Sequence, residues 1–123
     1  MFVTVVRAYL ALIYFDFCLA RGNFSTLCAK VRECPVQTGS RLRSERDICD
    51  AMDLALIWYW KKVLCLQRSA AATCLLRRYG VQAHLVMGAQ QMPFRAHAWV
   101  EVDGRVVNDK PYTPEMFAVI DRC

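Results

Sequence analysis

The stretch AHAWVEVDGRVVND, residues 96–109, constrains the fold of this chain more than any other part of the sequence. Its centre, Asp103 and Gly104, is a strong signal for a two-residue hairpin turn, and apolar and polar side chains alternate on both sides of it. Alternation of this kind is typical of strands with one buried face. We therefore expect an antiparallel pair of strands at residues 96–102 and 105–107.

The expected pairing also brings a histidine close to a carboxylate. With Val102 opposite Arg105, Asp109 returns to the level of Ala98, one residue from His97. A histidine that exchanges protons at one ring nitrogen needs an acceptor at the other, which fixes the tautomer and the orientation of the ring. The hairpin therefore predicts that Asp109 orients His97.

A helix predicted over residues 65–79 begins with Cys65. The thiolate is the form that attacks a carbonyl, and a thiol with a pKa of about 8.5 is mostly protonated at neutral pH. The unpaired N–H groups and the dipole of a first helical turn favour the anion, and a nearby imidazolium adds to this effect. Cys65, His97 and Asp109 therefore read as the nucleophile, the base and the orienting group of a cysteine hydrolase.

Each of these residues has a structural interpretation as well. Cys65 could be a small buried apolar residue, His97 a core or edge histidine, and Asp109 the start of a turn. The other histidine, His84, lies on a strand predicted near residues 82–88, where we expect it to be structural or to face solvent. The hypothesis of a catalytic site depends on the conjunction of the three residue types rather than on any one of them.

Four segments of the sequence resemble the transglutaminase-like peptidases of lasso peptide biosynthesis, the B2 protein family. The segments are CLQRS at residues 65–69, LLRRYGV at 75–81, PFRAHAWVE at 93–101 and VND at 107–109. The resemblance covers residues 61–110 well. It implies an α+β fold with a papain/transglutaminase-like cysteine protease core, in which N-terminal helices precede a small antiparallel sheet. It also implies a catalytic triad of Cys65, His97 and Asp109.

The resemblance further implies a cysteine peptidase that removes the leader peptide from a lasso peptide precursor, before an ATP-dependent cyclase closes the macrolactam ring. The implied partners are the precursor, a separate leader-recognition protein called B1, and the cyclase. A separate B1 protein is favoured because residues 1–60 read as helices, whereas a fused recognition domain would be rich in strands. We expect one domain over residues 1–123, with a helical part at 1–62 and the catalytic helix and sheet at 63–123.

An acyl-transfer reaction also needs donors for the oxyanion. The backbone N–H of Cys65 supplies one, because it lies at the unfilled end of a helix. Gln67 and Trp60 are candidates for the second donor by proximity alone.

Two other classes of function stay open. The first is a different acyl-transfer enzyme of transglutaminase type, which would join an amine to a glutamine instead of cutting a peptide. The second is a non-catalytic module that only binds a precursor or a partner. The mass of a treated precursor separates the first from a peptidase, and selective labelling of the Cys65 thiol separates the second.

Charge and cysteine content argue against other kinds of site. The net charge is +5, and the basic residues lie at helix ends and turns without interleaved aromatics, which disfavours a nucleic-acid partner. The seven cysteines are odd in number and include no Cys-x-x-Cys pair. We therefore expect reduced thiols in a cytoplasmic protein, with no metal site and no cofactor, and we assign no role to Cys123.

The N-terminal segment is strongly apolar. Its uninterrupted apolar run, residues 8–15, is bracketed by Arg7 and Asp16 and is shorter than the roughly 20 residues that a membrane span needs. We therefore expect no membrane span, and a helix that packs within the domain or against a partner.

The remaining elements follow from periodicity, caps and breakers. Helices are expected near residues 3–20, 25–32, 44–61 and 115–120, with Ser25 and Ser44 near the starts of the second and third, a linker at 37–40 and a loop at 90–93. The aromatic end of the third helix, residues 58–60, is expected in the core and in the wall of a groove. Arg77 and Arg78 read as the ordinary basic end of a helix that Gly80 caps.

Overall fold

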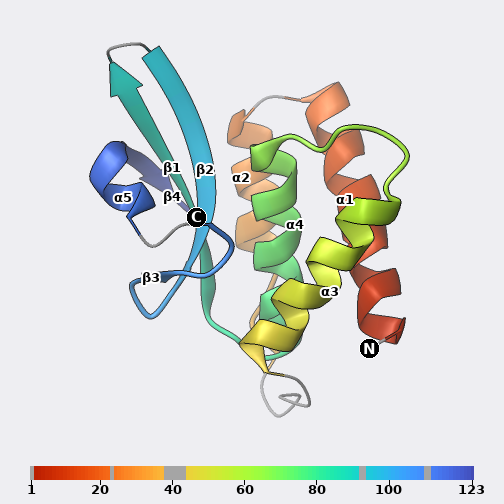
Figure 1. Cartoon of the computed structure of the whole chain (residues 1–123). Coiled ribbons are helices and arrows are strands. Elements are labelled where there is room, and N and C mark those ends of the chain that lie inside the picture. Colours follow the sequence, from red (N-terminus) through yellow and green to blue (C-terminus); the bar gives the residue numbers. More distant parts are fainter. Residues whose placement is uncertain (1, 23, 38–43, 92–93, 110–111) are drawn as a thin grey trace.

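The computed structural model describes residues 2–22, 24–37, 44–91, 94–109 and 112–123, and four helices precede a small sheet in it (Figure 1). The helices are α1 (Phe2–Arg21), α2 (Phe24–Glu33), α3 (Glu45–Trp58) and α4 (Cys65–Arg78). The later elements are β1 (Ala83–Gln91), β2 (Phe94–Val102), β3 (Arg105–Val106), the short helix α5 (Thr113–Met116) and β4 (Ala118–Arg122). The α+β class predicted from the sequence is confirmed.

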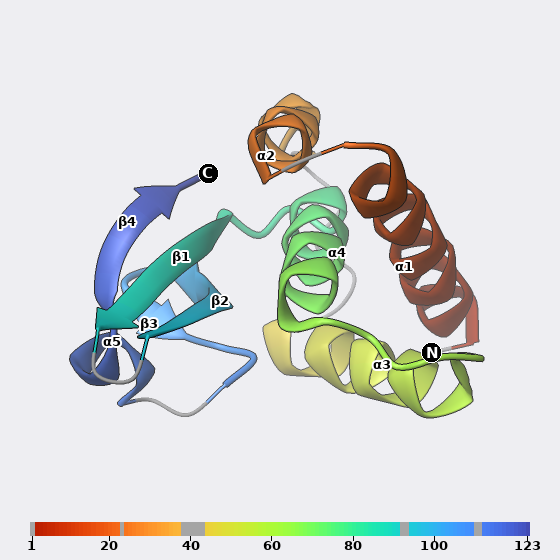
Figure 2. The same cartoon turned by 90° about the horizontal axis from the view of Figure 1, so that it is seen from above.

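Helix α4 lies at the centre of the molecule. The sheet stands on one side of it, and α1 stands on the other, while α2 and α3 close the remaining sides (Figures 1 and 2). Small residues such as Ala70, Ala71 and Ala72 are buried on α4, so the neighbouring elements can approach its backbone closely. The helix that begins with Cys65 is therefore held from all sides.

Helix α1 buries a single stripe. The stripe consists of Thr4, Ala8, Leu12 and Phe15, at the spacing of one helical face, and it packs against α3 and α4. By length and composition alone, the whole of α1 is apolar enough to cross a membrane, contrary to the expectation drawn from its short uninterrupted run. In this structure α1 acts as a packing helix, and most of its large apolar side chains outside the stripe are exposed.

The sheet has the strand order β3-β2-β1-β4, and every pair in it is antiparallel. The predicted register of the hairpin is confirmed, because Val102 pairs with Arg105 across the turn. Asp103 and Gly104 have φ angles of 53° and 76°, the left-handed conformation that a tight two-residue turn of this kind requires. The turn that sets the register of the hairpin therefore lies where the sequence predicts it.

The helix expected at residues 115–120 is wrong. Helix α5 ends at Met116, and the chain continues as β4, in which Val119 pairs with Gly88 of β1. A free edge of β1 offers unpaired backbone groups, and the branched side chains of Val119 and Ile120 suit a strand, so tertiary pairing overrides the short local pattern.

The third helix starts as predicted but ends earlier. The Ser44 side chain accepts a hydrogen bond from the Asp47 N–H at 3.1 Å, and the helix stops at Trp58 rather than near residue 61. Of the three consecutive aromatics, Tyr59 is buried at 8% exposure, whereas Trp58 and Trp60 are 76% and 71% exposed. The core role predicted for this aromatic end is therefore confirmed for Tyr59 alone.

Two smaller boundaries also differ. Ser25 lies inside the first turn of α2, which starts at Phe24, and does not precede the helix. Strand β1 continues through Gln91, so it takes up the first half of the loop expected at residues 90–93. Residues 92–93, and residues 38–40 of the expected linker, lie outside the described residues.

Two cysteines that were expected to be reduced are joined. Cys28 of α2 and Cys123 form a disulfide, which the spacing of cysteines along the chain could not indicate because β4 brings Cys123 back beside α2. The other cysteines, Cys18, Cys34, Cys49, Cys65 and Cys74, are free. The expectation of reduced thiols is wrong for this pair.

Arg77 is a buried anchor rather than an ordinary basic helix end. Its guanidinium donates to the carbonyl oxygens of Val31 at 2.6 Å, Ala83 at 2.9 Å and Cys123 at 3.1 Å. Arg78, in contrast, is exposed, as expected for a basic residue at a helix end. Arg77 therefore ties α2, the start of β1 and Cys123 to the end of α4.

Candidate active site

His97 and Asp109 are in direct contact. The distance from Nε2 of His97 to Oδ2 of Asp109 is 2.5 Å, and both side chains are about three-quarters buried or more, with exposures of 26% and 20%. The contact predicted from the hairpin register is thereby confirmed. Because Asp109 occupies Nε2, the other ring nitrogen, Nδ1, is the one left to exchange a proton with a substrate or a thiol.

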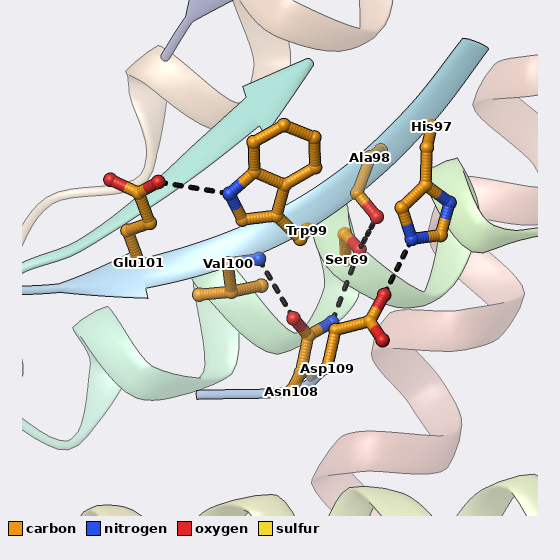
Figure 3. A network of polar contacts seen from close by, with 8 residues as sticks. All are labelled: Ser69, His97, Ala98, Trp99, Val100, Glu101, Asn108 and Asp109. Carbon is orange, nitrogen blue, oxygen red and sulfur yellow. Dashed lines mark hydrogen bonds and ion pairs between the residues drawn. The ribbon is translucent and has the colours of Figure 1, made fainter. Parts of the chain in front are cut away.

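Asn108 and Ser69 hold this pair against α4 (Figure 3). The Asn108 side chain accepts from the Val100 N–H at 2.8 Å and donates to the Ser69 hydroxyl at 3.1 Å, and that hydroxyl donates to the Ala98 carbonyl at 3.1 Å. Strand β3 is only two residues long, but the Val107 N–H still bonds to the Val100 carbonyl, and the Asn108 side chain completes this pairing by accepting from the Val100 N–H. The network therefore fixes the residue before Asp109 and the residue after His97.

Sequence reasoning missed Ser69 and Asn108 as site residues. Ser69 is fully buried on α4 beside a run of buried alanines, and a hydroxyl in such a place needs partners. A polar residue next to that apolar run was the available signal for Ser69. Asn108 offered none beyond its place next to Asp109.

An aromatic wall stands behind the His97 ring. The ring centroids of Phe117 and Trp99 lie 5.4 and 6.1 Å from it, and the Trp99 Nε1 donates to Glu101 at 2.9 Å. Gly88 of β1 leaves room for the wall, since a Cβ there would lie 2.7 Å from Phe117 and from Trp99. Phe117 was missed because it lies within the segment wrongly expected to be helical.

Cys65 is the first residue of α4 and is partly buried. The residue before it, Leu64, makes no side-chain cap hydrogen bond, so the first-turn N–H groups are left for another acceptor. Cys65 lies one turn before Ser69 on the same helical face, and Ser69 bonds to the residue after His97. Among the contacts of the described residues, none joins the Cys65 sulfur to His97.

Of the three residues of the predicted triad, the structure therefore brings His97 and Asp109 together. It places Cys65 at the start of α4, one turn before Ser69. The rival histidine, His84, is exposed on β1, as expected.

Gln67 is excluded as an oxyanion donor. Its side chain is 2% exposed and points the other way, where Nε2 donates to the Leu12 carbonyl at 2.8 Å and contacts the Tyr59 hydroxyl at 3.4 Å. The amide therefore joins α4 to α1. For Trp60, the other candidate, the described contacts are those with Tyr59 and Lys61 and do not point to the site.

Two hollows border the His97–Asp109 pair. One, of about 450 Å³, is lined by His97, Asp109, Arg68, Arg95 and Phe117 among others. The second, of about 300 Å³, lies on the side of α3 and shares Asp109 and Arg68 with the first. The described residues contain no group of three or more His, Cys, Asp or Glu that could hold a metal ion. The His97–Asp109 pair is therefore bordered by open space on two sides.

The α+β fold agrees with the transglutaminase-like class expected from the sequence, and a family model confirms that class. The chain belongs to the transglutaminase-like superfamily, whose model matches residues 10–122. It is similar to the microcin J25-processing protein McjB of Escherichia coli, with 43% identity over 56 residues, which are 46% of this chain and 27% of that protein. No solved structure shows a significant match.

These relationships confirm the resemblance to the B2 proteins of lasso peptide biosynthesis. The aligned stretch spans about a quarter of the length of McjB.

Proposed function

We propose that this protein is the cysteine peptidase that removes the leader peptide from a lasso peptide precursor. The observation that carries the proposal is the His97–Asp109 pair, held by Ser69 and Asn108 against the helix that Cys65 begins. Superfamily membership and the similarity to a microcin-processing protein support it. We interpret Cys65 as the nucleophile, His97 as the base and Asp109 as the group that orients the base.

The reaction would proceed by acyl transfer to water. The Cys65 thiolate attacks the carbonyl at the leader–core junction, and the resulting oxyanion is stabilised by the backbone N–H of Cys65. His97 then donates a proton through Nδ1 to the leaving amine of the core peptide, which leaves the leader as a thioester on Cys65. Water, deprotonated by His97, hydrolyses the thioester, and the thiolate and the imidazolium are restored.

The proposal includes partners and a place of action. The precursor is the substrate, a separate B1 protein presents its leader, and the macrolactam cyclase receives the freed amine. We place these steps in the cytoplasm, because a thiolate nucleophile such as Cys65 works where thiols are kept reduced.

The test is incubation of the precursor with this protein, with and without a B1 protein, followed by mass spectrometry. Wild-type protein should release the intact leader and the intact core, whose summed masses exceed the precursor by one water. Cys65→Ala should reduce the rate by about 10⁴-fold or more, whereas Cys18→Ala, a change at a partly buried thiol on α1 that lines neither hollow, should leave it unchanged. Full processing by Cys65→Ala would reject the assignment of the nucleophile.

Superfamily membership also favours a second candidate, a transglutaminase-type reaction. In that reaction the thioester forms on a glutamine side chain with loss of ammonia, and an amine takes the place of water. A precursor that gains the mass of an added amine minus ammonia, and is not cut, would support this candidate over the peptidase.

A further inference from the structure

Arg68 has a buried donor that is not used. Its Nε lies out of reach of solvent and has no hydrogen-bond partner within the described part of the chain. An unsatisfied buried donor costs about 1–3 kcal/mol, and native proteins contain few of them. Where one persists beside a candidate active site, a ligand that supplies the acceptor is the direct physical explanation.

The position of Arg68 relates this donor to the site. Arg68 is three residues after Cys65 on α4, and residues at this spacing share a helical face. Its side chain lines both hollows that border Asp109, the one of about 450 Å³ with His97 and the one of about 300 Å³ with Asn108. A peptide chain bound across His97 would therefore pass the guanidinium.

The charges around Arg68 leave it able to accept an anion. The Asp109 carboxylate is engaged with His97. Asp53, which lines the smaller hollow, has its pKa raised by partial burial, and the positive charge of Arg68 opposes that rise. Arg95 lines the larger hollow as a second, exposed cation, and neither arginine forms an ion pair within the described residues.

We propose that Arg68, assisted by Arg95, forms a subsite that binds a carboxylate side chain of the precursor next to the bond that is cut. The proposal rests on the proposed peptidase function and names a specificity-determining residue for it. A guanidinium presents donors in a planar fork that matches the two oxygens of a carboxylate, and hydrogen bonds to charged groups are about twice as strong as neutral ones. An Asp or Glu within about four residues of the cut site would be in reach of Arg68, because an extended chain advances about 3.3 Å per residue.

The experiment uses two synthetic peptides that cover the leader–core junction of the precursor. One keeps its Asp or Glu near the cut, and the other carries Asn or Gln at that position. Wild-type protein should cut the acidic peptide with a kcat/KM about 10- to 100-fold higher. Arg68→Gln should lose this preference by lowering the rate on the acidic peptide to that on the amide peptide, with most of the change in KM.

Arg78→Gln is the matched control, since Arg78 is an exposed arginine at the other end of the same helix. It should retain the preference. Thermal denaturation of each variant shows whether it is folded, and Arg68→Lys should restore part of the preference because it keeps the charge but loses the planar fork.

Two results would overturn the subsite. One is equal cleavage of both peptides by the wild type, or a junction that holds no Asp or Glu within four residues. The other is an equal loss on both peptides in Arg68→Gln, which would mean that Arg68 binds a backbone carbonyl or positions Asp109.

Failure of the peptidase function gives a different pattern, in which the wild type cuts neither peptide. Binding of the two labelled peptides to Cys65→Ala, followed by fluorescence anisotropy, then still tests the subsite. A preference for the acidic peptide supports it, and equal binding overturns it.

Discussion

The two ends of helix α4 are built in opposite ways. At the C-terminal end, the Arg77 guanidinium satisfies carbonyl oxygens from three other segments, and Gly80, at a φ of 86°, completes the cap. At the N-terminal end, Leu64 provides no side-chain cap and Cys65 is partly exposed. One turn further along the helix, the Nε of Arg68 has no hydrogen-bond partner among the described residues.

The C-terminal end of α4 thus contributes to stability, whereas the N-terminal end carries the residues that we propose for binding and catalysis. The end at which the hydrogen bonds are complete holds α2, the sheet and Cys123 together. At the N-terminal end, the uncapped first turn and the Arg68 Nε have donors that a bound substrate could use. Since one helix carries both, a rigid anchor at residue 77 also steadies the N-terminal part of α4, where Ser69 bonds to Ala98 of β2.

The largest effect that would sharpen this contrast is expected from Asp109→Asn. The amide keeps the shape of the side chain but can present its N–H₂ to Nε2 of His97, which would stabilise the wrong tautomer. We expect kcat for precursor cleavage to fall by about 10²- to 10⁴-fold, with an unfolding midpoint close to that of the wild type. A midpoint lowered together with kcat would show that the His97–Asp109 contact is also a structural anchor.

Arg77→Met should show the reverse pattern. The change removes three hydrogen bonds from the guanidinium, to the carbonyl oxygens of Val31, Ala83 and Cys123, at about 1 kcal/mol each, so we expect a loss of about 3 kcal/mol in the free energy of unfolding. Urea denaturation measures it, with Arg78→Met as an exposed control. The kcat of the folded fraction should be unchanged, and a selective loss of kcat would break the comparison.

Ser69→Ala tests the link between the two ends, with a smaller effect. It removes the hydrogen bonds to Ala98 and Asn108, and we expect about 1–2 kcal/mol less stability together with a several-fold lower kcat. Thr73→Val is the matched control, because its hydroxyl bonds back to the Ser69 carbonyl within the helix. If both variants have the same kcat, the network does not position the catalytic pair.

The smallest effect concerns thiol reactivity. A hydrogen bond from Cys74 and the charge of Arg77 together lower the pKa of Cys34 to about 7, against the opposing effects of burial and of Glu33. Alkylation of Cys34 by iodoacetamide should therefore rise with a midpoint near pH 7, since the thiol is protonated below that pH and ionised above it. Burial raises the pKa of Cys49 to about 11, so Cys49 should stay unmodified there.

Peptide mapping after labelling across pH measures these midpoints. A midpoint for Cys34 near the ordinary thiol value would contradict the expectation. Labelling that is meant to report on Cys65 is best done in Cys34→Ser, because Cys34 would otherwise compete for the reagent at neutral pH.

The hairpin and the His97–Asp109 contact could be predicted because their causes are local. The turn at Asp103 and Gly104 sets the register, and the register decides which residue faces His97. The Ser44 cap is local for the same reason, since the serine and the N–H it binds are three residues apart.

The parts that could not be predicted depend on where distant segments meet. Arg77 reads as an ordinary helix end until α2 and Cys123 surround it, and the Cys28–Cys123 disulfide requires the position of β4. Phe117 joins the His97 wall only because β4 pairs with β1. No short pattern in the sequence carries such long-range information.

The place of β4 beside β1 has a consequence for the order in which the protein becomes active. The hairpin of β2 and β3 can close soon after its residues leave the ribosome, whereas Phe117 reaches the His97 ring only after residues 113–122 have also emerged and docked on β1. A chain in which this segment has not yet docked would thus carry its histidine without the wall behind it. The surroundings of His97 are therefore complete only after β4 has paired with β1.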